Sequence, residues 1–309
     1  MHYDTENHLF EHKISGIKQE ISYPTQPLLL NIDLTFKCNM KCVHCVAMDM
    51  AERLGGKNEK SDLKITFELI DKINKSPFMV LVITGGEPLL PEYHKPLIKL
   101  IKKLKNKGII VDTNGTIIPS LELVEVFHEN NVLVRASWDI PHPKEEARLR
   151  KYPAGMYKND NEYMKTKQKV IKWLLDHNIN LAIQTVIHKY NYNNNNFLDF
   201  PYKLKQYGIN SWYIHRFIPS YHLKNVQFDQ KEYEKRISAI TKIAEKLGIK
   251  CQFKKDKRHN SVFLLVKDGE LYTQSDNVPG KKIPLGKIGE KIDYFAYVSA
   301  PDHAARYVL

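Results

Sequence analysis

The chain has 309 residues and 42% apolar content, enough to bury one large core and a small appendage. No apolar run approaches the roughly 18 residues of a membrane span, and the polar start lacks a secretory signal, so we expect a cytoplasmic protein with reduced thiols. The net charge of +12 favours an acidic partner, but no nucleic-acid-binding motif accompanies it.

The first predicted strand, Leu28 to Leu34, leads into a loop that carries Cys38, Cys42 and Cys45. A cubane iron–sulfur cluster needs four ligands, so three thiolates leave one iron open to a ligand that is not protein. Two other interpretations stay open on this spacing alone. The thiols would also share one face of a helix as small buried hydrophobes, or bind zinc together with His44, although the sequence offers no second pair of ligands.

A predicted helix, Thr66 to Lys75, precedes the second strand, Phe78 to Ile83. This strand ends in Thr84-Gly85-Gly86-Glu87-Pro88-Leu89. Two glycines allow backbone groups to approach a ligand closely, the Glu87 carboxylate can help to hold an ammonium group, and Pro88 stiffens the exit. Taken alone, the segment is more simply explained as an ordinary turn.

Together, the two motifs make the chain resemble the radical S-adenosylmethionine (radical SAM) superfamily, in the order of the cysteine loop and then Gly85, Gly86, Glu87 and Pro88. The resemblance implies one [4Fe–4S] cluster on the three cysteines, with its fourth iron chelated by the amino and carboxylate groups of S-adenosylmethionine. It also implies that His44 lies close to the adenine; the alternative is a loop histidine exposed to solvent.

The third and fourth strands fit the same pattern. The helix Lys95 to Lys107 leads to the strand Ile109 to Thr113 with the ending Asn114-Gly115-Thr116, and the helix Ser120 to Asn130 leads to the strand Val132 to Ser137. The resemblance implies that Asn114, Ser137 and Asp139 lie near the ribose or the methionyl carboxylate of the cofactor.

Two arginines follow in a charged helix, Lys144 to Lys151. The resemblance implies that Arg148 or Arg150 pairs with the methionyl carboxylate, for which a planar guanidinium is suited. The sequence does not decide between the two, and either is equally well explained as a surface residue.

The fifth and sixth strands, Leu181 to Ile187 and Ser211 to Phe217, follow the predicted helices Glu162 to His177 and Asn196 to Tyr207. The resemblance implies that Val186 contacts the adenine. Arg216, at the end of the sixth strand, either faces the cofactor or an acidic substrate group or forms a peripheral salt bridge.

Strand and helix thus alternate six times, which demands parallel strands joined by right-handed crossovers. Six units do not easily close an eight-stranded barrel. The fold class is therefore α/β, and the resemblance implies an open, partial (β/α)6 barrel of the TIM type with a small C-terminal α+β extension. Every motif falls at the carboxyl end of a strand, where such folds carry their chemistry.

We predict an N-terminal extension over residues 1–26, the barrel over 27–220 and a C-terminal part over 221–309. The last part contains a predicted helix, Lys231 to Leu247, and three short strands, Lys250–Lys254, Ser261–Val266 and Glu270–Gln274. It resembles a degenerate SPASM or twitch domain, the auxiliary-cluster domain of peptide-modifying members, without the cysteines. We therefore predict no second cluster.

The remaining cysteine, Cys251, has two interpretations. It is either a partly buried structural thiol or a hydrogen-atom donor to a substrate radical.

The resemblance implies an oxidoreductase that cleaves S-adenosylmethionine reductively and takes a hydrogen atom from its substrate. The favoured substrate is a ribosomally synthesised peptide, changed by epimerisation, crosslinking or another carbon-centred reaction. A small molecule, such as a nucleotide or amino-acid derivative, is the alternative, and a non-catalytic iron–sulfur sensor is a third. The expected partners are an electron donor such as flavodoxin or ferredoxin and a separate leader-peptide-binding protein, since the segment before the first strand is short.

Overall fold

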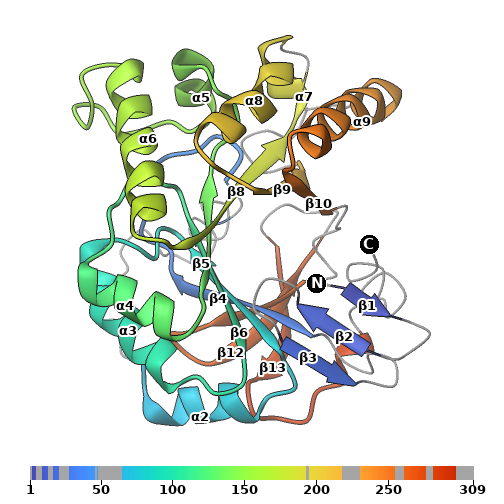
Figure 1. Cartoon of the computed structure of the whole chain (residues 1–309). Helices are drawn as coiled ribbons and strands as arrows, with labels where there is room; N and C mark the ends of the chain where they lie inside the picture. The colour runs from blue at the N-terminus through green and yellow to red at the C-terminus, as the bar shows by residue number, and fades with distance from the viewer. Residues whose placement is uncertain are drawn as a thin grey trace.

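An open sheet of ten strands, with helices packed along one face, forms the body of the molecule (Figure 1). The computed structural model describes residues 2–4, 9–12, 17–20, 28–45, 47, 65–192, 195–217, 230–254, 261–275 and 281–296. The strand order is β10-β9-β8-β7-β6-β5-β4-β11-β12-β13. In these ranges, no helix combines the length and the apolarity needed to cross a bilayer.

The six predicted strands are present and pair in parallel, each with the next one in the chain. They are β4 (Leu29–Thr35), β5 (Val80–Gly85), β6 (Gly108–Thr113), β7 (Leu133–Ser137), β8 (Asn180–Ile187) and β9 (Ser211–Arg216). Parallel neighbours need crossover connections, and the intervening helices supply them. The predicted α/β class with a partial barrel is confirmed.

The helices are α2 (Phe67–Lys75), α3 (His94–Lys103), α4 (Leu121–Glu129), α5 (Pro143–Leu149), α6 (Asp160–Asp176), α7 (Lys189–Tyr192), α8 (Phe200–Gln206) and α9 (Gln230–Lys246). Short 3-10 turns lie at Pro91–Tyr93, Asn195–Asp199 and Tyr294–Ala296. Side-chain oxygens of Thr66, Ser120 and Asn159 cap the first turns of α2, α4 and α6, which explains why these helices begin where they do.

The predicted helix Lys95 to Lys107 is too long. It ends at Lys103, because Leu104 adopts an extended conformation. Lys107 instead donates from its ammonium to the carbonyl oxygens of Ser76 (2.9 Å) and Phe78 (2.6 Å). This lysine therefore connects the end of α2 to the start of β6.

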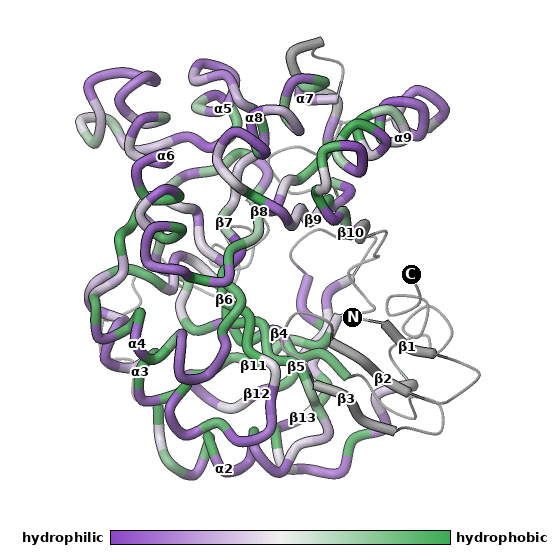
Figure 2. The backbone as a smooth tube through the Cα atoms, in the orientation of Figure 1, coloured by the Kyte–Doolittle hydropathy of each residue, from purple (hydrophilic) through white to green (hydrophobic). Residues whose placement is uncertain are grey.

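Side chains alternate between the two faces of the sheet. Residues such as Leu30, Ile32 and Leu81 face the helices and join the main apolar core. On the opposite face, a smaller apolar layer includes Ile110, Leu133 and Ala182, together with Leu28, Leu29, Met79, Val80, Val82 and Tyr213. Figure 2 shows the hydrophobic colour along β4, β5 and β6 in the middle of the molecule.

Polar residues replace this smaller layer toward the carboxyl ends of the strands. Asp112, Arg135 and Gln184 each follow a residue of the layer by two positions, so they point to the same side. Arg135 pairs with Asp112 through two contacts of 2.6 and 2.8 Å, in the bidentate geometry that a guanidinium favours. The non-helical face of the sheet is therefore apolar at its amino end and polar where the predicted motifs lie.

The predicted C-terminal strands are also present, and they join the central sheet. β10 (Lys250–Lys254) pairs in parallel with β9, and β11 (Val262–Leu265) pairs in parallel with β4. β12 (Glu270–Gln274) and β13 (Lys282–Lys287) continue that edge as antiparallel strands. The division at residues 220 and 221 stays a prediction, but the strands on its two sides share one sheet.

The N-terminal segment contains three short strands that the sequence analysis did not predict. β1 (His2–Asp4), β2 (Leu9–His12) and β3 (Ile17–Glu20) pair antiparallel in a separate sheet.

Candidate active site

The two predicted motifs meet directly at the carboxyl edge of the sheet. The N–H of Gly86 donates to the carbonyl oxygen of Thr35 (2.5 Å), and the N–H of Glu87 donates to that of Lys37 (2.9 Å). A Cβ atom on Gly86 would lie 2.0 Å from the Lys37 oxygen, and one on Gly85 would lie 2.2 Å from the Thr35 oxygen. Both distances are far below van der Waals contact, so only glycine allows this approach, and it fixes the start of the cysteine loop.

The Glu87 carboxylate is fully buried and binds protein groups. Oε1 accepts hydrogen bonds from the Thr113 hydroxyl (2.8 Å) and the Leu89 N–H (3.0 Å), and Oε2 accepts one from the Asn114 N–H (2.6 Å). Burial raises the pKa of Glu87 to about 7, although these donors act in the opposite direction. The side chain therefore joins the loops after β5 and β6, and a direct hold on an ammonium group stays a prediction.

Asn114 connects the loop after β6 to the cysteine loop. Its Nδ2 donates to Oδ1 of Asn39 (2.7 Å) and lies 3.8 Å from Sγ of Cys38, while its Oδ1 accepts from the Thr116 N–H (2.9 Å). Nδ2 of Asn39 donates in turn to the Thr116 hydroxyl (2.9 Å). The Asn-Gly-Thr ending thus supports the backbone beside the first cysteine.

The end of α5 and the residues that follow it hold the cysteine loop from its other side. The N–H of Lys41 donates to the carbonyl oxygen of Lys151 (2.6 Å), and that of Val43 donates to the carbonyl oxygen of Leu149 (2.9 Å). Between these two bonds lies Cys42, whose Sγ is 4.0 Å from Nη1 of Arg150. The loop is therefore fixed on both sides by backbone hydrogen bonds.

The three loop cysteines are of intermediate burial, and Cys38 and Cys42 pack against Met40, Ala147 and Tyr163. Burial raises the pKa of the Cys42 thiol to about 12, even with Arg150 nearby. A thiol in this setting becomes a thiolate when a metal supplies positive charge.

Three thiols on one loop that backbone hydrogen bonds hold in place suit a cubane iron–sulfur cluster, because each cysteine sulfur binds a different iron. The donor set therefore fits an iron–sulfur cluster with one open iron.

His44 is buried, so the alternative of an exposed loop histidine is wrong. Its Nε2 lies 3.3 Å from Oδ2 of Asp139, and its ring centroid lies 5.7 Å from that of His188. Burial lowers the pKa of His44 to about 3 and that of His188 to about 4, so both rings are neutral. Among the described groups, His44 Nδ1 and His188 Nε2 have no hydrogen-bond partner, which leaves two buried nitrogens available to a ligand beside the cysteine loop.

Asp139 and Arg150 form a buried ion pair, with Nε of Arg150 2.7 Å from Oδ2 of Asp139. Oδ1 of Asp139 also accepts the N–H of Val186 (2.8 Å), so the ends of β7 and β8 meet at this carboxylate. Burial alone would raise the pKa of Asp139, but the Arg150 guanidinium and the hydrogen bond from the Val186 N–H outweigh it and hold the pKa well below its usual range. Ser137 lies close by and accepts a hydrogen bond at Oγ from Gln184 (3.1 Å).

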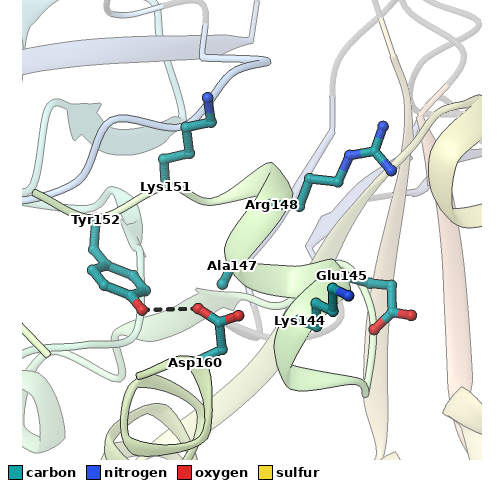
Figure 3. Close-up of a pocket in the computed structure, with 7 residues that line it drawn as sticks. All are labelled: Lys144, Glu145, Ala147, Arg148, Lys151, Tyr152 and Asp160. Atoms are coloured by element: carbon teal, nitrogen blue, oxygen red, sulfur yellow. Dashed lines mark hydrogen bonds between the residues drawn. The ribbon is translucent and has the colours of Figure 1, made fainter. Parts of the chain in front are cut away.

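The structure separates the two candidate arginines. Arg150 is 6% exposed and faces Asp139 and Cys42. Arg148 is exposed, lies over the Tyr190 ring at 5.0 Å, and lines a pocket of about 610 Å³ between α5 and α6 (Figure 3). That pocket is bordered by Lys144, Glu145, Ala147, Arg148, Lys151, Tyr152 and Asp160. Only Arg150 belongs to the group around the cysteine loop.

The structure does not bring Arg216 to this group. In the register of β8 and β9, Arg216 pairs with Ile187, a core residue on the helix side of the sheet. Its guanidinium lies 5.6 Å from the ring of Tyr233 on α9, and the side chain is exposed. The expectation that it faces the cofactor is wrong, because strand alternation turns it outward.

Cys251 also lies apart from the loop cysteines. It is the second residue of β10, in register with Trp212 of β9, and packs against the helix-side core. The loop cysteines follow the carboxyl end of β4, whereas Cys251 lies near the amino end of its parallel strand. This position favours the structural thiol over the hydrogen-atom donor.

Sequence analysis missed two buried charged residues of the site, Glu146 and Lys167, and the buried ring of His188. One signal was available for Lys167. Along α6 it falls in the stripe of buried positions that includes Tyr163, Met164, Val170, Ile171 and Leu174. A lysine at a core position of an amphipathic helix indicates a buried partner.

Comparison with known proteins places these features in a family. Residues 32–223, more than half of the chain, match the family model described as the radical SAM superfamily. The chain is 32% identical over 116 residues to the subtilosin biosynthesis protein AlbA of Bacillus subtilis, which covers 37% of this chain and 24% of AlbA. It is 29% identical over 112 residues to a GTP 3',8-cyclase of Synechocystis, with 36% of this chain and 33% of the relative covered.

A third relative is the Fe-coproporphyrin III synthase of Methanosarcina barkeri, 35% identical over 88 residues, or 28% of this chain and 21% of the synthase. All three alignments thus cover 33% or less of the relative.

Two solved structures share the fold over most of the chain. anSMEcpe with bound AdoMet has a TM-score of 0.64 at 18% identity and covers 91% of this chain and 83% of that chain. Streptococcus suis SuiB bound to S-adenosylmethionine has a TM-score of 0.62 at 12% identity, and the alignment covers 92% of this chain and 68% of SuiB. These similarities agree with the partial barrel.

Proposed function

Because the chain belongs to the radical SAM superfamily, whose enzymes use a [4Fe–4S] cluster and S-adenosylmethionine, we propose that Cys38, Cys42 and Cys45 hold one such cluster. We further propose that the enzyme modifies a ribosomally synthesised peptide by epimerisation, crosslinking or another carbon-centred change. The observation that carries the proposal is the close packing of Gly85 and Gly86 on the backbone that leads into the cysteine loop.

When bound, the reduced cluster and S-adenosylmethionine would supply one-electron cleavage of the sulfonium carbon–sulfur bond, with release of methionine, and so the abstraction of a hydrogen atom from an unreactive carbon. The protein binds and orients the cofactor. The backbone of residues 85–88 and the Arg150 guanidinium would receive its amino acid part, with Asn114, Ser137 and Asp139 close by. His44 and Val186 would border the adenine, and the buried, neutral ring of His44 suits a dry contact.

Three features support a peptide substrate. AlbA, a bacteriocin biosynthesis protein, matches part of the chain. SuiB has been solved with its precursor peptide SuiA, and anSMEcpe with a peptide. The third feature is the sequence resemblance of the C-terminal part to an auxiliary-cluster domain without the cysteines, which stays a prediction. An electron donor such as flavodoxin or ferredoxin and a separate leader-peptide-binding protein complete the proposal.

A small-molecule substrate is the second candidate. The matches to a GTP 3',8-cyclase and an Fe-coproporphyrin III synthase support it, because both names describe enzymes that act on small molecules. The sensor alternative is not retained, since members of this family are enzymes.

The test uses the full chain, reconstituted anaerobically with iron and sulfide and reduced with dithionite. With S-adenosylmethionine it should release 5′-deoxyadenosine, and Cys38→Ala, Cys42→Ala and Cys45→Ala should each abolish this release. A precursor peptide encoded beside the gene, made with deuterated residues, should then transfer deuterium into 5′-deoxyadenosine. Release by any of the three cysteine variants contradicts the cluster assignment, and deuterium transfer only from a small molecule contradicts the peptide assignment.

A further inference from the structure

Four charged side chains lie buried together next to Cys42. Asp139, Glu146 and Lys167 are 0% exposed and Arg150 is 6% exposed. Two are cations and two are anions, so the group as a whole is neutral. Removing charges from water is costly unless each has a partner, and losing one partner leaves an uncompensated charge. The arrangement of partners therefore decides what further charge the group can accept.

The ammonium group of Lys167 contacts three buried residues. Its ammonium donates to Oε1 of Glu146 (2.5 Å) and to the carbonyl oxygen of Ser137 (2.9 Å), and it lies 5.2 Å from the centroid of the Tyr163 ring. All of these partners are buried. Lys167 thus neutralises Glu146 while it holds the carboxyl end of β7.

Glu146 connects Lys167 to the turn that carries Asp139. Its Oε2 accepts hydrogen bonds from the N–H groups of Asp139 and Ile140, both at 3.0 Å. Its Oε1 lies 3.7 Å from Nε of Arg150, compared with 2.5 Å from Lys167. Arg150 is therefore flanked by two carboxylates, and Lys167 compensates the one that is not closely paired with it.

We propose that Lys167 is a positioning residue whose charge leaves Arg150 free to receive a third carboxylate, the methionyl carboxylate of S-adenosylmethionine. The inference rests on the proposed function, because that function brings this carboxylate to Arg150. With Lys167, two cations balance the two protein carboxylates. Without it, Asp139, Glu146 and the incoming carboxylate would share a single guanidinium, and their repulsion would weaken binding.

The decisive experiment removes each charge of the Lys167–Glu146 ion pair in a separate variant. Lys167→Met keeps the length of the stem and removes the cation, so the affinity of the reconstituted enzyme for S-adenosylmethionine should fall by at least about tenfold. Glu146→Gln removes the anion and keeps an oxygen for the two N–H groups, so the affinity should be unchanged or tighter. Affinity is measured by calorimetric titration, independently of turnover, with circular dichroism and iron content recorded for each variant.

Lys172→Met is the matched control, because Lys172 lies on the same helix, is exposed, and pairs with Asp176 at 2.9 Å. It should bind like the wild type. A purely structural role of the ion pair predicts that both Lys167→Met and Glu146→Gln weaken binding, and that result overturns the inference. So does wild-type affinity in a folded Lys167→Met variant.

If Lys167→Met does not fold, the Glu146→Gln variant still tests the inference. Weaker binding of S-adenosylmethionine by Glu146→Gln would contradict the charge argument. Failure of the wild-type protein to bind S-adenosylmethionine at all would instead reject the proposed function.

Discussion

At the scale of single residues, the geometry of the cysteine loop depends on Gly86. The hydrogen bond from its N–H to Thr35 and the absence of a side chain let the loop after β5 lie against the backbone of residues 35–37. A methyl group would meet the Lys37 carbonyl oxygen at 2.0 Å, and a backbone atom at that distance cannot rotate away. The loop that carries the thiols would have to move.

Gly86→Ala should therefore cost about 1–3 kcal/mol of stability by overpacking and reduce the iron retained after anaerobic reconstitution. Gly155→Ala is the control for the steric contact, because within the described structure no atom lies within 4 Å of the added Cβ, and Gly155, unlike Gly86, has a positive φ of +81°. It should lose about 1–2 kcal/mol from the backbone alone and keep its iron. Full iron content in Gly86→Ala would show that the contact does not shape the loop.

Residue patterns predicted the cysteine loop and the Gly-Gly-Glu-Pro segment because each motif is contiguous in the sequence. The choice between Arg148 and Arg150 needed the structure, since the first lies in the last turn of α5 and the second caps it, and only the packing of α5 on its neighbours decides which one is buried. Glu146 appeared as one more charge in a charged helix. Its burial depends on Lys167, which lies on another helix, and no local pattern reports such a pairing.

At the scale of elements, alternation along a strand decides which side chains reach the site. Strand β9 has Tyr213 on the non-helical face, so Trp212, Ile214 and Arg216 turn toward the helices. Strand β10 continues this register and places Cys251 beside Trp212. The sequence located both strands, but it did not tell which face was which, because both faces carry apolar residues.

Cys251→Ser should leave 5′-deoxyadenosine release and product formation unchanged, because the thiol lies at the amino end of β10 and on the helix side. Both quantities are measured on the reconstituted enzyme with its substrate. A variant that still cleaves S-adenosylmethionine but forms no product would mean that this thiol donates a hydrogen atom after all.

Sequence analysis also placed the strands after α9 in an extension, whereas they pair with both edges of the barrel sheet. β10 extends the β9 edge, and β11 extends the β4 edge across a large separation in sequence. Short strands carry little information about their partners, since pairing depends on the edge that the rest of the fold leaves open.

At the scale of the whole molecule, the cysteine count limits the cofactor content. Three of the four cysteines lie in the loop after β4, and the fourth is the partly buried thiol of β10. Anaerobic reconstitution should therefore give about four irons per chain, the content of a single cubane. A value near eight would require a second cluster and would contradict the proposal of a C-terminal part without one.

The most direct test of the proposed active site is electron paramagnetic resonance of the anaerobically reconstituted, dithionite-reduced protein, recorded before and after addition of S-adenosylmethionine. An iron that no protein group ligates should bind the cofactor and change the g values of the reduced cluster. The same addition to Cys42→Ala should change nothing. A wild-type protein with no cluster signal, or with a signal that the cofactor leaves unaltered, would contradict the assignment of the cysteine loop and of the chemistry proposed for it.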